Sequence, residues 1–135
     1  MLSIAIRYVA ALAVLAIGDV FWLGYFGRTV VNPTLKPIMR DTLDWRAIVL
    51  FYLLYTIGII VFAVAPALAN RSAGQAFFYG LLFGFLAYMT YDVTNYATIS
   101  VWTIKLAVMD VAWGTFISGV AGLVSYGVTR AVIRS

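Results

Sequence analysis

Residues 47–68, AIVLFYLLYTIGIIVFAVAPAL, form an apolar run of 22 residues without a charged side chain. An α-helix rises about 1.5 Å per residue, so this run matches the roughly 30 Å thickness of a bilayer's hydrocarbon core. Pro66 lies in the last predicted turn, where the loss of a backbone hydrogen bond costs least. The run therefore predicts a helix that crosses a membrane.

Three further stretches share this composition, at roughly residues 4–26, 75–97 and 102–128. Tight turns at 70–74 and 98–101 predict that the second, third and fourth helices are antiparallel neighbours. We therefore expect an all-α integral membrane protein. It should form one domain, residues 1–135, built as an up-down bundle of four transmembrane helices.

The first connection differs from the other two, because residues 28–45 are polar and contain two X-Pro steps. Asn32-Pro33 and Lys36-Pro37 disfavour helical backbone before each proline. A long polar loop is therefore predicted between the first two helices, with a short turn on the membrane surface at 39–43.

The composition excludes several classes of function. Hydrophobic residues make up 64% of the chain and charged residues 10%, against about 25% charged residues in a typical soluble domain. The chain has no cysteine and no histidine, so sites built on thiolate or imidazole, including haem and zinc sites, are excluded. We expect no cofactor and no metal. The net charge of +4 is spread over helix ends, which gives no indication of a nucleic-acid partner.

Basic residues divide almost evenly between the two predicted membrane faces. The loop side carries Arg28, Lys36, Arg40, Arg46 and Lys105, and the side of the termini carries Arg7, Arg71, Arg130 and Arg134. This division gives almost no positive-inside bias. Both termini are predicted in the cytoplasm, because their side of the membrane lacks acidic residues.

Asp19, Asp92 and Asp110 each interrupt an otherwise apolar stretch. A charge at the centre of a transmembrane helix costs about 2.5–3.5 kcal/mol on insertion scales, and ionisable residues there are functional by default. The predicted helices alternate in direction, so all three aspartates should lie toward the loop side. Like charges in one layer repel, so at least one of these aspartates is expected to be protonated.

Aromatic and amide side chains lie one helical turn from the aspartates. Positions three or four apart share a helix face, which adds the following candidates to a polar pocket: Trp22, Tyr88, Asn95 and Trp113, with Tyr52 and Tyr55 from the second helix. Tyr91, directly before Asp92, is a further candidate. The basic residues of the loop side, Arg28, Lys36, Arg40, Arg46 and Lys105, should form its rim. The alternative is that the aspartates only join helices. Asp19 would then accept from an indole or a tyrosine, Asp92 from Lys105, and Asp110 from Asn95.

Small residues recur every four positions in the third and fourth predicted helices. Gly80 and Gly84 form one such stripe, and Gly114, Ser118 and Gly122 form the other. Small residues at this spacing let helices approach closely in a membrane. The stripes predict packing within the bundle, with a homodimer contact as the alternative.

The run AYMTYDVTNYATISVW, residues 87–102, followed by MDVAWG at 109–114, resembles a bacterial family of predicted membrane proteins, domain of unknown function 2177. The matching residues are Tyr91, Asp92, Thr94 and Asn95; Asp110, Trp113 and Gly114; and Asp19 with Trp22. The resemblance implies a small four-span protein of the bacterial inner membrane and a candidate site. It implies no established activity.

Three functions remain open on the sequence. The first is a protein that binds or transports a small cationic or lipophilic ligand in an acidic and aromatic pocket. The second is a cofactor-free membrane enzyme that acts on a lipid or isoprenoid by proton transfer, with the basic loop holding a phosphate. The third is a structural subunit of a larger membrane complex.

Overall fold

The computed structural model describes residues 1–133, which contain no strand. Helical residues make up 89% of the described residues. Four helical stretches are long and apolar enough to cross a membrane: Leu2–Ile38, Trp45–Asn70, Ala73–Thr98 and Ile104–Ile133. Their elements are α1 (Leu2–Trp22), η1 (Leu23–Val31), α2 (Asn32–Leu35), η2 (Lys36–Ile38), α3 (Trp45–Ile59), η3 (Ile60–Val64), α4 (Ala65–Asn70), α5 (Ala73–Thr98) and α6 (Ile104–Ile133). The predicted all-α class and the four spans are confirmed.

The prediction of a long loop at 28–45 is largely wrong, because the first helical stretch continues to Ile38. Pro33 and Pro37 are the second residues of α2 and η2, and each removes one backbone N–H from the hydrogen bonds of this continuous helical stretch. Only 39–44 connect this stretch to α3 without helical structure.

Two π-helical segments precede prolines at the same distance. η1 ends two residues before Pro33, and η3 ends two residues before Pro66. The N–H of Asn32 donates to the carbonyl of Gly27, and that of Ala65 to Ile60, each five residues back. A proline ring crowds the carbonyl four residues before it, and a widened turn relieves this contact while the helix continues.

Side-chain caps and one left-handed residue set the other helix ends. Asp44 begins α3 by accepting from the N–H of Arg46, and Ser72 begins α5 by accepting from Gln75, both at 3.1 Å. Arg71 has a φ of 51°, and the N–H of Ser72 returns to the carbonyl of Ala67 at 3.0 Å. This helix-ending motif makes the sharp turn between α4 and α5.

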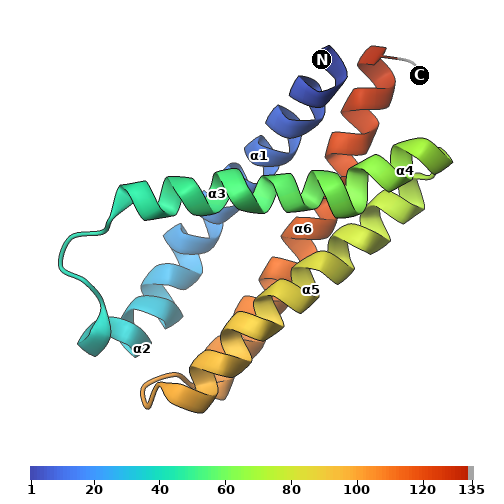
Figure 1. Cartoon of the computed structure of the whole chain (residues 1–135). Coiled ribbons are helices and arrows are strands. Elements are labelled where there is room, and N and C mark those ends of the chain that lie inside the picture. The colour runs from blue at the N-terminus through green and yellow to red at the C-terminus, as the bar shows by residue number, and fades with distance from the viewer. Residues whose placement is uncertain (134–135) are drawn as a thin grey trace.

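The long helices α5 and α6 lie antiparallel side by side, and α1 packs on another side of α6 (Figure 1). The second stretch differs, because α3 crosses in front of the others at a wide angle in Figure 1. It approaches α5 mainly through η3 and α4. The second and third stretches are therefore neighbours near their connecting turn, as predicted, and separate away from it.

Both stripes of small residues pack against other helices of the same chain. A Cβ at Gly84 would lie 2.5 Å from the carbonyl oxygen of Gly114, and a Cβ at Gly80 would lie 2.6 Å from that of Ser118. Gly122 faces Ala76 in the same way. The stripes therefore pack within the bundle, as predicted, and a homodimer contact stays a prediction.

Candidate functional site: an acidic and aromatic cluster

Asp19 joins three helices. Its carboxylate accepts hydrogen bonds from the hydroxyl of Tyr52 on α3 and, at 2.9 Å, from the indole N–H of Trp113 on α6. A phenol and an indole are the two partners that the helix-joining alternative predicted for this residue. Asp19 therefore has a structural explanation that requires no ligand.

Trp22 and Trp113, which each follow an aspartate by three residues, pack against each other. Trp22 and Trp113 stack with ring centroids 5.3 Å apart and planes 10° from parallel. Trp22 is buried and also contacts Phe26. The sequence predicted both tryptophans as pocket residues, but the structure uses them to hold α1 against α6.

Asp110 lies beside a cavity of about 380 Å³ between α3, α5 and α6, which we call the aromatic cage. Its lining is Phe51, Tyr55, Ala87, Tyr88, Tyr91 and Asp110. Tyr55 meets Phe51 at 5.4 Å and Tyr88 edge-on at 6.1 Å between ring centroids. The cavity thus combines a carboxylate with four aromatic rings, and Phe51 and Tyr91 are each about half exposed.

Two small residues of α6 place the rings of the cage. A Cβ on Gly114 would collide with the ring of Tyr88, so that ring lies flat against the helix only because Gly114 has no side chain. The hydroxyls of Tyr55 and Ser118 are hydrogen-bonded at 2.6 Å. The close approach of α5 to α6 therefore also builds one wall of the cage.

Asp92 has a different environment. The residue is 0% exposed, and neither carboxyl oxygen has a hydrogen-bond partner among the described residues. Asp110 and the indole of Trp102 are its polar neighbours, yet the indole N–H also has no partner. Lys105, the predicted partner of Asp92, is exposed and forms no ion pair with it.

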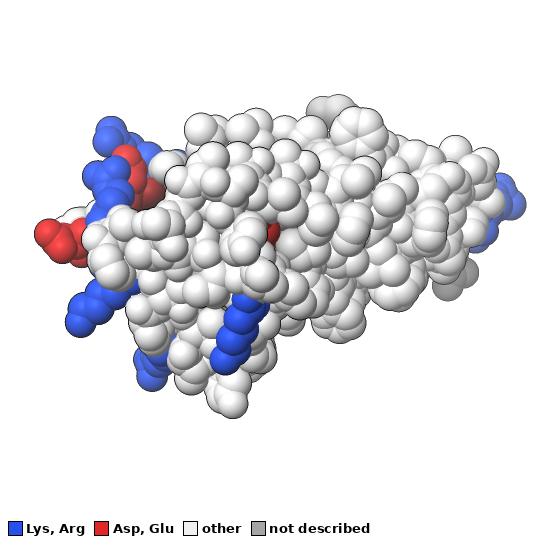
Figure 2. All heavy atoms as spheres, turned by 90° about the horizontal axis from the view of Figure 1, so that it is seen from below, with Lys and Arg blue, Asp and Glu red and all other residues white. Residues whose placement is uncertain are grey.

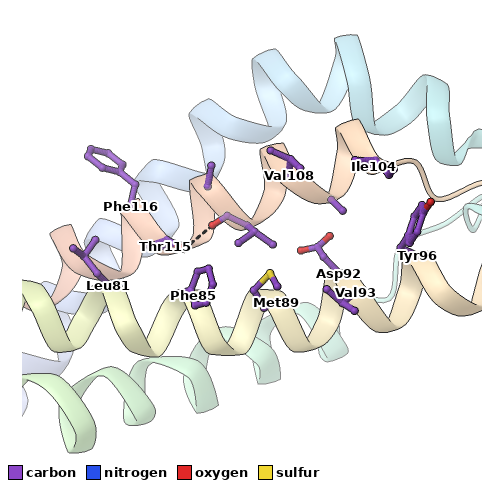
Figure 3. A pocket seen from close by; sticks show the side chains of 13 residues that line it. Leu81, Phe85, Met89, Asp92, Val93, Tyr96, Ile104, Val108, Thr115 and Phe116 are labelled. Carbon is purple, nitrogen blue, oxygen red and sulfur yellow. Dashed lines mark hydrogen bonds between the residues drawn. The ribbon is translucent and has the colours of Figure 1, made fainter.

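A second cavity of about 620 Å³, which we call the seam groove, runs between α5 and α6 and includes Asp92 in its lining. In Figure 3 the carboxyl of Asp92 points from α5 toward α6, between Met89 and Val108. The lining is Leu81, Phe85, Met89, Asp92, Val93, Tyr96, Ile104, Ala107, Val108, Val111, Ala112, Thr115 and Phe116. Asp92 is the one ionisable carboxyl in this apolar lining.

The three aspartates do not share the single pocket that the sequence predicted. Asp110 neighbours both Asp92 and Asp19, while the cage and the seam groove have no lining residue in common. Asn95 lies beside Tyr91 and lines neither cavity. It makes no hydrogen bond with Asp110, contrary to the helix-joining alternative.

The predicted basic rim borders neither cavity. Arg28, Lys36, Arg40, Arg46 and Lys105 are all exposed, and Arg46 pairs with Asp44 at 3.5 Å. Figure 2 shows most charged atoms toward one end of the protein, with an almost uncharged middle. This distribution fits residues of a membrane-water interface better than residues of a pocket.

Several lining residues were not predicted. Phe51 and Ala87 complete the cage, and Phe85 and Met89 precede Asp92 by two turns and one turn of α5. Helical spacing from Asp92 and Tyr91 could have identified the α5 residues. The contribution of Phe51 depends on the oblique course of α3, which no local pattern indicates.

Comparison with known families agrees with this architecture. Residues 4–127 match the model of a family described as "Predicted membrane protein (DUF2177)". No similar curated protein and no similar solved structure was found. Since the match spans nearly the whole bundle, including all three aspartates, the chain belongs to this family of predicted membrane proteins.

Proposed function

We propose that the protein binds a small lipophilic cation in the aromatic cage, with Asp110 as the counter-charge. The observation that carries this proposal is the composition of the cavity: one carboxylate and four aromatic rings around about 380 Å³. Tyrosine and phenylalanine rings attract a cation within about 6 Å of the ring centroid, and such cages are a known means of recognising quaternary ammonium groups.

The surroundings of the cage favour a cation over a neutral or anionic ligand. Asp92 and Asp19 both neighbour Asp110, and the exposed lysine and arginine side chains lie away from the cavity lining. Charge interactions are stronger where water is excluded. A lipophilic cation would offset the repulsion among these carboxyls and match the apolar part of the lining. Transport would follow if the cage were reached from both sides of the membrane.

The test measures the binding of benzyltrimethylammonium, a permanent cation, to the protein in lipid nanodiscs. Asp110→Asn keeps the side-chain shape and removes the charge, so affinity should fall at least about tenfold, which corresponds to about 1.4 kcal/mol. Asp44→Asn is the matched control, since Asp44 lies at the start of α3 outside both cavities. Affinity should also decrease in acid, because protonation removes the carboxylate charge.

Two results would contradict the proposal. One is unchanged binding in the Asp110→Asn variant. The other is equal binding of the neutral carbon isostere of the probe, since this would leave no role for charge.

The adjacent carboxyls of Asp92 and Asp110 favour a second candidate, a cofactor-free enzyme acting on a lipid or isoprenoid. One carboxyl would donate a proton and the other would accept one. Lipid analysis of cells with the wild-type protein and with Asp92→Asn should then reveal a species that depends on the enzyme. Identical lipid profiles would exclude this candidate under the conditions used.

We also propose that both termini lie in the cytoplasm when the protein is in a bacterial inner membrane. The end that carries the N-terminus has Arg7, Arg71 and Arg130 without an acidic residue, whereas Asp41 and Asp44 lie at the other end; Arg134 lies outside the described residues. The chain has no cysteine, so Met39→Cys and Asn70→Cys each introduce one thiol. A membrane-impermeant maleimide should label only Met39→Cys in intact cells, and the reverse result would invert the orientation.

A further inference from the structure

The seam groove lies on a face of the α5–α6 pair that the proposed cation site does not use. Several of its residues are widely exposed: Val93 by 50%, Val108 by 61% and Ile104 by 62%. Because α5 and α6 are apolar enough to cross a membrane, this face would contact lipid chains. An occupant would therefore enter from within the bilayer.

The groove is elongated, and its polar group lies near one end. Along α5 the lining extends from Leu81 to Tyr96, about 22 Å at helical rise. Asp92 lies about 6 Å from the Tyr96 end and about 16 Å from the Leu81 end on the same measure. The polar end of an occupant would thus lie toward Tyr96, with a long apolar part extending toward Leu81.

Asp92 defines the chemistry of that polar end. Its carboxyl is fully buried, and neither oxygen has a hydrogen-bond partner in the part of the chain that the structure describes. A buried acceptor without a partner is costly, so an occupant that donates hydrogen bonds would be stabilised there. Asp110 is its neighbour, which adds negative charge and disfavours an anionic head group.

We propose that the seam groove is a binding site for a single-chain amphiphile with a primary ammonium head. The ammonium donates to the carboxyl of Asp92, and the hydrocarbon chain lies between α5 and α6 toward Leu81 and Phe116. This site goes beyond the aromatic cage, since it uses a different carboxyl, a different cavity and a ligand with a long chain.

The test uses hexadecylamine with a photoactivatable diazirine in its chain, added to the full-length protein in nanodiscs of phosphatidylcholine. After irradiation, mass spectrometry locates the labelled residues. Labels should concentrate on residues 81–96 and 104–116. The corresponding alcohol and carboxylic acid, with the same chain and diazirine, should label these segments at least several-fold less.

Two variants separate the head-group contact from the space for the chain. Asp92→Asn should reduce amine labelling of the groove severalfold by removing the charge. Ala112→Phe fills the groove from an exposed position and should reduce labelling while leaving Asp92 intact. Ala13→Phe, at an exposed position of α1 outside the described cavities, is the matched control and should change nothing.

Equal labelling by the amine, the alcohol and the acid would overturn the proposal, because the groove would then be an ordinary lipid contact. Unchanged labelling in Ala112→Phe would overturn it as well. So would a dimer in solution whose cross-links place a second copy in the groove. None of these results depends on benzyltrimethylammonium binding at Asp110, so the failure of this site and that of the cage are distinguishable.

Discussion

Asp19 and Asp92 carry the same side chain in opposite environments. We call the contact of α1, α3 and α6 around Asp19 the junction, and the packed face between α5 and α6 that includes Asp92 the seam. Asp19 receives hydrogen bonds from Tyr52 and Trp113, whereas the carboxyl of Asp92 is fully buried without a partner among the described residues. Both residues lie in helices that are apolar enough to cross a membrane. An aspartate inside an apolar helix is therefore not by itself a sign of a site; its partners decide whether it joins helices.

The helix packing around the two carboxyls explains the contrast. At the junction, long aromatic side chains fill the space between α1, α3 and α6 and bring donors to Asp19. At the seam, glycines bring the backbones of α5 and α6 together. The indole N–H of Trp102 lies near Asp92 but makes no hydrogen bond, so the carboxyl is enclosed among apolar side chains without a partner among the described residues.

The largest effect is expected where the seam itself is changed. Gly84→Leu would force a side chain into the carbonyl of Gly114 and into Ser118, and overpacking costs about 3 kcal/mol at the upper end of its usual range. The protein should unfold at a lower fraction of SDS in mixed micelles. Gly24→Leu is the control, because a Cβ there meets nothing within 4 Å. Equal losses in both variants would show that the seam is not specially constrained.

Replacement by leucine should change the free energy of unfolding in opposite directions at Asp19 and at Asp92. Asp19→Leu removes two hydrogen bonds, each worth about 0.6 kcal/mol in membrane proteins, and leaves two donors without a partner. We expect a loss of about 1–2 kcal/mol in unfolding free energy. Asp92→Leu removes an unpartnered carboxyl and should increase that free energy by about 1 kcal/mol.

Unfolding titrations in SDS measure both changes, and Ala16→Leu, exposed on α1, provides a reference that should not change. A loss in Asp92→Leu as large as that in Asp19→Leu would mean that Asp92 also joins helices. In that case the contrast between the junction and the seam would disappear.

The smallest effect concerns a single bond at the junction. Tyr52→Phe removes the hydroxyl that donates to Asp19 and keeps the ring, so a loss of about 0.6 kcal/mol is expected. In the Asp19→Leu background the same change should cost nothing, because the acceptor is already absent. A double-mutant cycle in the same SDS titration measures this coupling, and equal costs in both backgrounds would refute the bond's role.

The four spans, the all-α class and the candidate aspartates could all be predicted from local patterns. Apolar runs of sufficient length define membrane helices, because the bilayer imposes a fixed thickness. The stripes at Gly80 and Gly84 and at Gly114, Ser118 and Gly122 also indicated close packing, since small residues at this spacing have one main use in membranes. These properties depend on residue type and spacing along one helix.

Only the tertiary structure decided which carboxyl received partners. Tyr52 is 33 residues from Asp19 and Trp113 is 94 residues away, so their contacts depend on the crossing angle of α3 and the rotation of each helix. The widened turns before Pro33 and Pro66 also lay beyond the sequence pattern, which indicated a break at Pro33. The sequence determined that three carboxyl groups lie in the membrane helices. Packing between helices determined that Asp19 is hydrogen-bonded between helices, Asp110 faces aromatic rings and Asp92 is enclosed.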